Sequence, residues 1–358
     1  MVSYVYLSLK ELEIKLNKQK GETIMAVPSL DIFSPQISTV ARGLEGKVIL
    51  VYGGNNLGKT KQATRMKNPF YLPFEAGLNA IAGIPYVPIG RWSDFIKINK
   101  QLTDPSTVKK ARELYSTIIF DSIEPAARYC QEFICQKYGA ESIASGNRGY
   151  GLWNEYATEF WAQINKLTKA GYCVYFIAHA QADSETGYIS PKADKRSLAP
   201  IIDATDVTVY VESNGVDENG RIIKSSGYLA ETDKFFARSR FDYLPTTKIE
   251  EFTAENLENV IVEAIKKQEE VEGIKTVTFD EQKATREIVR KTYDELMDEM
   301  QELGEKMAEI GYLDDLQAIV ANNLGADKKA SDLKKGQEQQ IEAIIYDIQS
   351  FLADNNIE

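Results

Sequence analysis

Short apolar runs alternate with longer stretches of helical periodicity from Lys47 to about Asp242. An apolar run of four to eight residues between turn signals predicts a buried strand, whereas apolar residues at a 3.6-residue spacing predict a helix. The expected strands are 47–52, 70–74, 86–89, 116–120, 172–178, 205–212, 227–231 and 234–239, and the expected helices are 59–66, 92–102, 122–137, 151–169 and 197–203. This alternation predicts an α/β fold with a mostly parallel sheet flanked by helices.

Two polar stretches that contain glycine interrupt the alternation, 139–151 and 182–196. Such composition is typical of loops. A third stretch, 212–221, contains Asn214-Gly215 and Asn219-Gly220, and Asn-Gly favours a tight turn between two strands. We therefore expect two loops in the first two places and a hairpin or loop insertion in the third.

After Thr247 the chain becomes helical and highly charged. Seven apolar residues recur there at alternating spacings of four and three: Val289, Tyr293, Leu296, Met300, Leu303, Met307 and Ile310. This seam is typical of a coiled coil but spans only three heptads, and two shorter amphipathic stretches follow it, 313–320 and 341–351. A small three-helix bundle therefore fits the pattern better than a dimeric coiled coil.

The pattern divides the chain into an N-terminal extension (1–27), an α/β core (28–247) and an acidic helical C-terminal region (248–358). Within the extension, the residues just before Met25 are compatible with a purine-rich ribosome-binding sequence. We therefore hypothesise that translation naturally starts at Met25 and that residues 1–24 are a non-native leader. Because codons are degenerate, a native extension is the alternative.

Charge is distributed unevenly. Residues 251–358 contain 26 acidic and 12 basic side chains, while the whole chain carries a net charge of −11. Most of this acidity is expected on solvated helix faces, and the alternative is an acidic module that repels nucleic acid or binds a basic partner.

Several classes of protein are disfavoured by composition. No apolar run approaches the length of a membrane span, and residues 1–20 alternate apolar and charged side chains, unlike a signal peptide. Three cysteines (Cys130, Cys135 and Cys173) match no zinc spacing, and the chain has one histidine. We expect no transition-metal site built from protein ligands, and a reducing, intracellular compartment.

The motif G-x-x-x-x-G-K-[ST] follows the first expected strand. Its residues are Gly53, Gly54, Asn55, Asn56, Leu57, Gly58, Lys59 and Thr60. Glycines allow backbone N–H groups to face a phosphate, and the start of a helix adds partial positive charge. In this P-loop, Lys59 is expected to reach the β- and γ-phosphates and the Thr60 hydroxyl to bind Mg²⁺. The motif therefore predicts a nucleoside triphosphate site.

Two acids are candidates for the chemistry at that site. Asp121 ends the apolar strand 117–120, as a Walker B acid does, and is expected to hold Mg²⁺ opposite Thr60. Ser122 follows it, so no second acid stands beside Asp121 to activate water. Glu75, which closes the strand at 70–74, is the best candidate for the general base. The alternative for Glu75 is an acid on a surface loop.

Four further polar residues lie on strands, or just after them, late in the core. His179 ends the strand 172–178, and Gln181 comes two residues later, so this pair is a candidate sensor of the γ-phosphate. The alternative for His179 is a hydrogen-bonded histidine at the edge of the core. Arg238 and Arg240 share one face of a strand because they lie two residues apart. They are candidate arginine fingers for a neighbouring subunit, and surface ion pairs are the alternative.

The two expected loops combine cations with aromatic residues, as single-stranded nucleic-acid sites do. The candidate contacts are Arg148 and Tyr150 in the first loop, and Tyr188, Lys192, Lys195 and Arg196 in the second. Acidic residues in the same stretches, such as Glu141 and Asp183, weaken this prediction.

The order of these parts resembles the core of RecA-type recombinases, and more closely the short RecA-like ATPases of bacteriophage that assist single-strand annealing. The resemblance covers about residues 28–245 and is most specific in GGNNLGKT, IIFDS and YFIAHAQ. It implies that Glu75 positions the attacking water, that His179 occupies a sensor position, and that the loops near 139–150 and 182–196 bind DNA. It also implies that Arg238 and Arg240 reach the ATP of the next protomer.

Two departures from that family concern assembly and partners. The stretch Pro73-Phe74-Glu75 lacks the second acid common before the catalytic glutamate, and the C-terminal helices have no counterpart. The expected function is an ATP- and Mg²⁺-dependent, oligomeric RecA-like ATPase that acts on single-stranded DNA in the bacterial cytoplasm. Two alternatives share the core: a ring helicase or motor, and an ATP-binding adaptor. The acidic C-terminus is expected to bind a single-strand binding protein or a recombinase.

Overall fold

The computed structural model describes residues 32–33, 35–286 and 290–357. The described residues form two compact units: a larger one that spans Gln36–Thr285, and a smaller one that comprises the residues from Arg286 onward together with residues 32–33 and 35. The hypothesised leader and the start of the core at residue 28 lie outside the described residues.

A nine-stranded sheet organises the larger unit, in the order β2-β3-β4-β1-β6-β7-β9. Its parallel strands are β1 (Val48–Gly53), β2 (Pro69–Pro73), β3 (Thr117–Asp121), β4 (Cys173–Ala182) and β6 (Val207–Glu212). The antiparallel strands are β5 (Ile189–Lys192) on β4, β7 (Ser226–Tyr228) and β8 (Arg238–Ser239) on β6, and β9 (Lys248–Ile249) on β7. The P-loop strand β1 is central, and β4 separates it from β3. The prediction of a mostly parallel sheet is confirmed.

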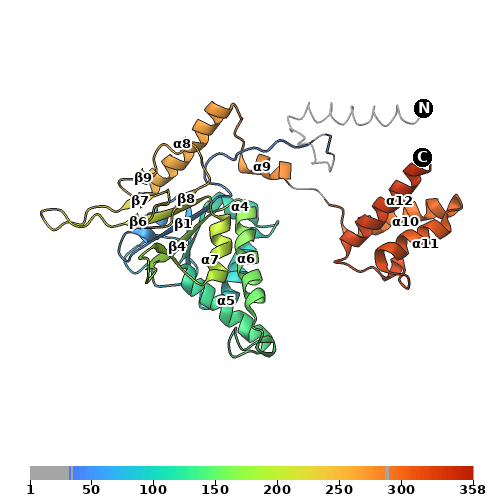
Figure 1. Cartoon of the computed structure of the whole chain (residues 1–358), viewed down its shortest axis with the longest axis horizontal. Coiled ribbons are helices and arrows are strands. Elements are labelled where there is room, and N and C mark those ends of the chain that lie inside the picture. The colour runs from blue at the N-terminus through green and yellow to red at the C-terminus, as the bar shows by residue number, and fades with distance from the viewer. Residues whose placement is uncertain (1–31, 34, 287–289, 358) are drawn as a thin grey trace. The chain divides into compact units, whose positions relative to one another are not determined.

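Helices cover both faces of this sheet (Figure 1). Alternate residues of β1 divide between the two layers: Leu50 and Tyr52 pack on one side, Ile49 and Val51 on the other. The first side is covered by α3 (Trp92–Thr103), α5 (Ile123–Tyr138), α6 (Trp153–Lys169) and α7 (Lys195–Ala204). The second side is covered by α2 (Lys59–Ala63) and α8 (Ala254–Glu272). The P-loop therefore lies between two packed layers.

The end of the core differs from the expected boundary at 247. Strand β9 extends the sheet, and Leu257, Val260 and Ile261 of α8 are buried against it, because their spacing forms one apolar helix face. The next helix, α9 (Phe279–Arg286), also begins within the larger unit, where Phe279 packs closely on Gly46 and Gly171. The core unit consequently runs on to Thr285.

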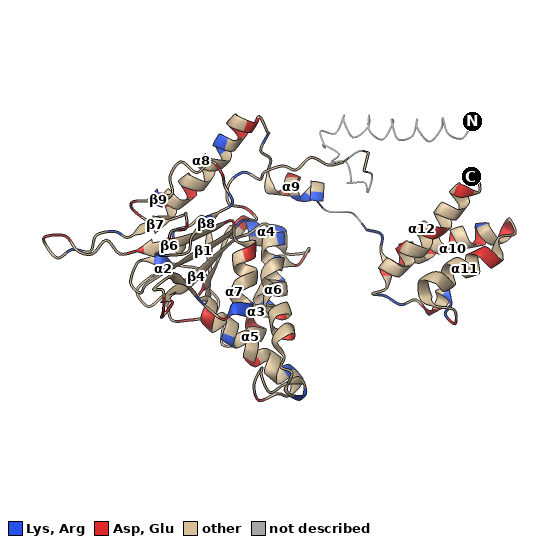
Figure 2. Ribbon diagram, viewed as in Figure 1, with Lys and Arg blue, Asp and Glu red and all other residues tan. Residues whose placement is uncertain are grey.

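The smaller unit contains three helices: α10 (Tyr293–Glu309), α11 (Leu313–Leu324) and α12 (Glu338–Asp354). Leu296, Met300 and Met307 of α10 form a core with Ile341, Ile344, Ile345 and Ile348 of α12, while α11 contributes half-buried side chains. Acidic residues occur at several positions along these helices (Figure 2). The structure thus contains the expected three-helix arrangement; Val289, the first residue of the expected seam, lies outside the described residues.

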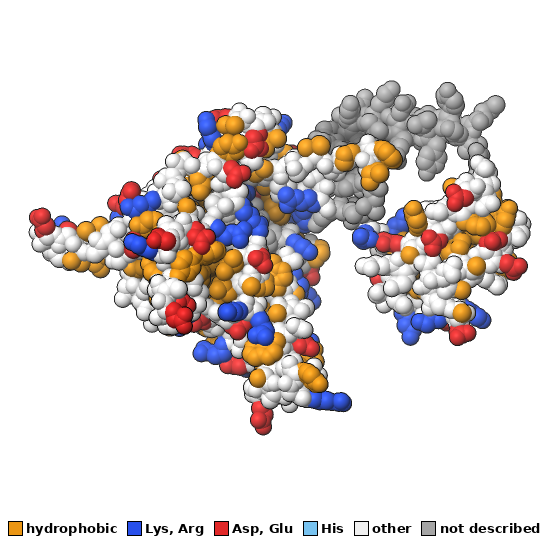
Figure 3. Space-filling view, in the orientation of Figure 1, with side chains coloured by type: hydrophobic (Ala, Val, Ile, Leu, Met, Phe, Trp, Pro, Cys, Tyr) orange, Lys and Arg blue, Asp and Glu red, His pale blue; other side chains and the backbone are white. Residues whose placement is uncertain are grey.

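The connection between β6 and β7 projects from the sheet as a hairpin, as its turn signals indicate (Figure 1). The tip closes where Asp217 donates its N–H to the Arg221 carbonyl, at 2.8 Å. Val216 and Ile222 pair across the hairpin and are 62% and 79% exposed, so its surface mixes apolar and charged side chains (Figure 3).

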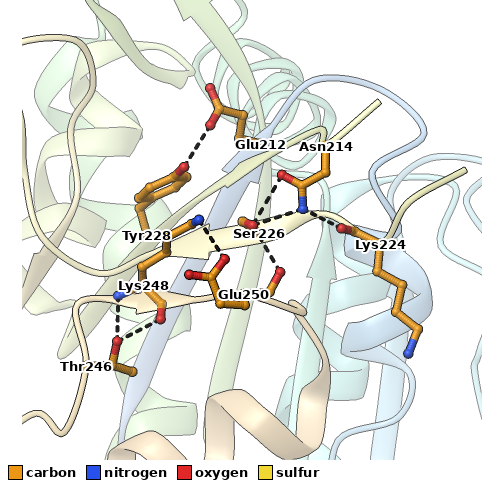
Figure 4. A network of polar contacts seen from close by, with 8 residues as sticks. All are labelled: Glu212, Asn214, Lys224, Ser226, Tyr228, Thr246, Lys248 and Glu250. Carbon is orange, nitrogen blue, oxygen red and sulfur yellow. Dashed lines mark hydrogen bonds and ion pairs between the residues drawn. The ribbon is translucent and has the colours of Figure 1, made fainter. Parts of the chain in front are cut away.

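A polar network fixes the base of this hairpin to the sheet edge (Figure 4). Asn214 Nδ2 donates to the Lys224 carbonyl at 2.6 Å, and Ser226 Oγ donates to the Glu250 carbonyl at 3.0 Å. Tyr228 Oη donates to Glu212 at 2.9 Å. Because Ser225 Oγ also bonds the Leu57 carbonyl at 3.3 Å, the hairpin base touches the P-loop.

Some elements differ from the sequence pattern. The expected strand 86–89 is only an isolated bridge between Tyr86 and Tyr71, and the expected loop 182–196 contains β5 and the first turn of α7. Helix α4 (Val108–Leu114) was not expected, because it has no buried face to create periodicity. Among the described residues, no helix is long and apolar enough to cross a membrane.

Candidate functional site

The P-loop follows β1 directly and ends in the first turn of α2. Gly53 cannot carry a side chain without displacement, since a Cβ there would lie 2.4 Å from the Val211 carbonyl oxygen on the neighbouring strand β6. Gly58 caps α2 with φ of 82°, a left-handed conformation that glycine adopts without steric cost. These two glycines shape the turn that presents Lys59 and Thr60 at the start of the helix.

Lys59 is buried beneath this loop. Its Nζ donates to the carbonyls of Gly53 and Gly54, at 3.0 and 2.5 Å, and only 6% of the residue is exposed. Burial lowers the pKa of Lys59, while the charges of Asp121 and Glu75 act in the opposite direction. The ammonium is thus a desolvated cation held by weak acceptors, and a phosphate oxygen would replace those carbonyls with a stronger partner.

Asp121 ends β3 and faces α2. Its Oδ2 accepts hydrogen bonds from Thr60 Oγ1 and Tyr71 Oη, each at 2.7 Å. Its Oδ1 is buried and has no hydrogen-bond partner among the described residues. A buried carboxylate oxygen without a partner beside a hydroxyl group suits a magnesium ion, which prefers oxygen ligands. The residues expected to hold Mg²⁺ are therefore adjacent and fit that ion.

Glu75 lies where the strand pattern placed it, just beyond β2. Its N–H donates to the Asp121 carbonyl at 3.1 Å, and its Oε1 is 3.9 Å from Nε2 of His179. Partial burial and then the charge of Asp121 raise the pKa of Glu75, while His179 acts in the opposite direction. A glutamate with a raised pKa is better suited to accept a proton near neutral pH than an ordinary one.

These groups line one cavity of about 770 Å³, within the usual size range of small-molecule sites. Lys59, Thr60, Glu75, Asp121 and His179 all contribute to its wall. Apolar side chains, among them Ile81 and Ile84, also line it. The cavity thus combines charged groups for a phosphate chain with an apolar region beside them.

The candidate sensor residues diverge. His179 faces the cavity, whereas the Gln181 side chain turns to β5, where Nε2 donates to the Pro191 carbonyl at 3.4 Å. Lys192 lies opposite His179 in the antiparallel pair β4–β5 and forms an ion pair of 3.1 Å with Glu124. With Gly53 and Gly54, His179 and Lys192 line a second hollow of about 420 Å³. The structure therefore places Lys192 beside the P-loop.

Strand β8 is shorter than the expected strand 234–239: Arg238 lies in it, and Arg240 lies one residue beyond its end. Both side chains bond to carbonyl groups at the C-terminus of α7. Arg238 Nη1 donates to the Ile202 carbonyl at 3.3 Å, and Arg240 Nη2 donates to the Asp203 carbonyl. Arg240 also forms an ion pair of 3.6 Å with Asp206. Because Thr208 pairs with Arg238 near the start of β6, both arginines lie at the sheet edge opposite the P-loop of their own chain.

Only some of the candidate DNA-contacting residues lie near one another. Arg148 lies in a short 3₁₀ turn, Asn147–Gly149, and the next residue but one, Tyr150, is 86% exposed. Lys195 and Arg196 form the first turn of α7, and the Arg196 guanidinium lies 4.1 Å from the ring centre of Trp153, the first residue of α6. This cation–π contact joins the end of the expected loop 182–196 to the residue that follows the expected loop 139–151 by two positions. Tyr188 instead donates its hydroxyl to Glu231.

Sequence reasoning missed two residues of the site. Tyr71 reads as an ordinary core residue of β2, yet its hydroxyl binds Asp121. Gly77 packs against the same groups, because a Cβ there would lie 2.3 Å from Tyr71 Oη and 2.5 Å from Asp121 Oδ2. Only the polar hydroxyl of Tyr71 in an apolar run offered a signal.

Together, the parallel sheet, the P-loop and the acids at the carboxyl edge define a P-loop nucleotide-binding domain. The chain matches the family described as "AAA domain" over residues 45–241 and belongs to that family of P-loop NTPases. It is also 51% identical, over 326 residues, to the SPbeta prophage-derived uncharacterized protein YorG of Bacillus subtilis (strain 168). That alignment covers 91% of this chain and 100% of the relative. The predictions of a P-loop ATPase fold and of phage kinship are confirmed.

Proposed function

We propose that the protein binds and hydrolyses Mg²⁺·ATP and that its nucleotide state controls its binding to single-stranded DNA during phage recombination or strand annealing in the bacterial cytoplasm. One observation carries the ATPase part: Lys59, Asp121 and Glu75 reach a single cavity from three different strand ends. A buried cation for the phosphates, a metal-binding acid and a separate base are the groups that phosphoryl transfer requires.

Each group has a distinct task. The P-loop N–H groups and Lys59 bind the phosphate chain, and Thr60 with Asp121 would hold Mg²⁺, which neutralises charge on the phosphates. Glu75 orients water and accepts its proton, since Ser122 follows Asp121 where a second acid would otherwise stand. His179, 3.9 Å from Glu75, is positioned to respond when the γ-phosphate leaves. The raised pKa of Glu75 favours this proton transfer.

Two observations support the proposed binding of DNA: the cations in the segments 139–151 and 182–196, and the resemblance to RecA-like phage ATPases. Arg148, Tyr150 and Lys195 are exposed, and the Arg196–Trp153 contact links the two segments. Cations beside aromatic rings suit a phosphate backbone and stacked bases. Lys192 lies beside the P-loop, so a change of nucleotide reaches the second segment through β5.

A homo-oligomer with shared ATP sites completes the proposal. In that assembly Arg238 and Arg240 act on the nucleotide of a neighbouring subunit, for which both must leave the α7 carbonyls that they bind within their own chain. The acidic three-helix unit binds a basic surface of a single-strand binding protein or a recombinase.

Glu75→Gln tests the coupling of nucleotide to DNA. The variant keeps ATP but cannot hydrolyse it, so we expect its affinity for a fluorescent single-stranded oligonucleotide in Mg²⁺·ATP to remain constant while that of the wild-type protein falls as ADP accumulates. Glu263→Gln on the exposed face of α8 is the matched control and behaves as wild type. If the DNA affinity of wild-type protein and of Glu263→Gln is the same in ATP as in ADP, the proposal is contradicted.

A second candidate is an ATP-binding adaptor that scarcely hydrolyses ATP. The separate core of the C-terminal unit favours it, because a self-contained bundle is a natural recruitment module. An adaptor would bind ATP without hydrolysing it and would capture a partner through residues 290–357. These two results distinguish it from the proposed ATPase. Directional strand displacement identifies a helicase instead.

A further inference from the structure

Tyr71 is a fully buried residue whose hydroxyl forms a hydrogen bond to Asp121, the acid expected to bind Mg²⁺. It lies in the middle of β2, is 0% exposed, and donates its hydroxyl to Asp121 Oδ2 at 2.7 Å. Tyr71 pairs in register with Ile119, and Pro73 pairs with Asp121, so the tyrosine and the aspartate extend from the same face of the sheet. This is the face that α2 and Thr60 cover.

The two donors to Oδ2 differ in kind. Thr60 belongs to the P-loop helix, and its hydroxyl is the group expected to bind the metal. Tyr71 comes from the sheet itself and is fully buried among core residues, so we expect its bond to Asp121 to remain when the Thr60 hydroxyl binds another group. The remaining oxygen, Oδ1, is buried without a partner among the described residues.

We propose that Tyr71 is a positioning residue of the magnesium site, whose hydroxyl fixes the Asp121 carboxylate so that Oδ1 stays free for the cation. This inference rests on the proposed function, because it assumes that Asp121 binds Mg²⁺. A hydrogen bond to a charged group is stronger than a neutral one, and the carboxylate has few other partners to restrain its rotation.

Gly77 provides a second, independent constraint. The segment after Glu75 turns back, with the Gly77 N–H donating to the Glu75 carbonyl at 2.9 Å, and passes directly over the tyrosine–aspartate pair. A Cβ on this residue would collide with Tyr71 Oη and Asp121 Oδ2, at 2.3 and 2.5 Å. The close approach therefore encloses the bond and keeps water from it.

The test compares ADP affinity with and without Mg²⁺, measured by calorimetry so that no hydrolysis is needed. In Tyr71→Phe, which removes only the hydroxyl, we expect ADP alone to bind as in wild type and the gain in affinity from Mg²⁺ to fall about tenfold, with recovery at higher Mg²⁺. Tyr175→Phe is the matched control, because the Tyr175 hydroxyl is buried in the same layer but has no partner among the described residues. It leaves the gain unchanged.

Gly77→Ala extends the test in case Tyr71→Phe is poorly folded. It should reduce the Mg²⁺ gain in the same way, whereas Gly90→Ala, whose Cβ meets nothing closer than 3.7 Å, should not. A purely structural role for Tyr71 would lower the melting temperature but leave the Mg²⁺ gain intact, which would overturn the inference. Wild-type protein that binds no nucleotide at all would overturn the proposed function as well.

Discussion

Asp121, Glu75 and Lys59 show how the residues of this site depend on one another. Two carboxylates and an ammonium share a space in which Asp121 and Lys59 are buried and Glu75 is partly buried, so their charges interact more strongly than in water. Lys59 offsets part of the repulsion between the acids, yet burial still raises the pKa of Glu75 and lowers that of Lys59. Such a site costs folding stability and gains reactivity in return.

The raised pKa of Glu75 predicts how stability depends on pH in metal-free protein. Because the folded state favours protonated Glu75, wild-type protein loses stability as pH rises above the ordinary pKa of 4.5 and through the raised one. Glu75→Gln carries no such charge, so its melting temperature relative to wild type should be higher at pH 8 than at pH 5. Thermal unfolding in EDTA checks this. A difference that is constant, or that shrinks towards pH 8, would contradict the assigned burial of Glu75, and Glu263→Gln should show no trend.

At the scale of elements, α8 is the least expected support of the site. The charge of the region after Thr247 suggested a separate helical module, but one face of α8 covers the sheet layer that contains Ile49 and Val51, directly behind the P-loop strand. The site therefore depends on residues about 200 positions further along the chain.

This packing predicts a clear difference between two positions on α8. Ile261→Ala removes a side chain that is 1% exposed and should lower the free energy of unfolding of the core unit by about 2–4 kcal/mol. Glu263→Ala, on the exposed face two residues later, should change it by less than about 0.5 kcal/mol. Urea unfolding followed by the fluorescence of the tryptophans, all three of which belong to the core unit, measures both. Equal effects at the two positions would show that α8 does not pack on the sheet.

The sequence was sufficient for the central strands and the P-loop, because apolar runs and a spaced glycine motif are local signals. It was insufficient where tertiary contacts decide. Pro191 hides β5, since proline in a short polar stretch indicates a loop. The hydrogen bond of the Tyr71 hydroxyl and the carbonyl bound by Arg238 depend on neighbours that are distant in sequence. The acids Glu75 and Asp121 were identifiable because Asp121 ends β3 and Glu75 lies just beyond β2, at the same edge of the sheet.

At the level of the whole molecule, the described residues form two units with separate cores, and we propose a different role for each. The larger unit contains the nucleotide cavity and the segments proposed to contact DNA, and the smaller contains an acidic bundle. In the proposed function, ATP sets the DNA-binding state of the larger unit while the smaller one recruits a partner. Nucleotide and DNA must then influence each other, because coupling between two ligands is reciprocal.

The rate of ATP hydrolysis with and without single-stranded DNA shows directly whether DNA acts on the nucleotide site. We expect single-stranded DNA to raise the turnover of wild-type protein several-fold, to leave that of Glu75→Gln at background, and to have less effect on a variant in which Arg148 and Lys195 are both alanine. If wild-type protein binds ATP but hydrolyses it at the same rate with and without DNA, the proposed coupling between DNA and the nucleotide site is contradicted.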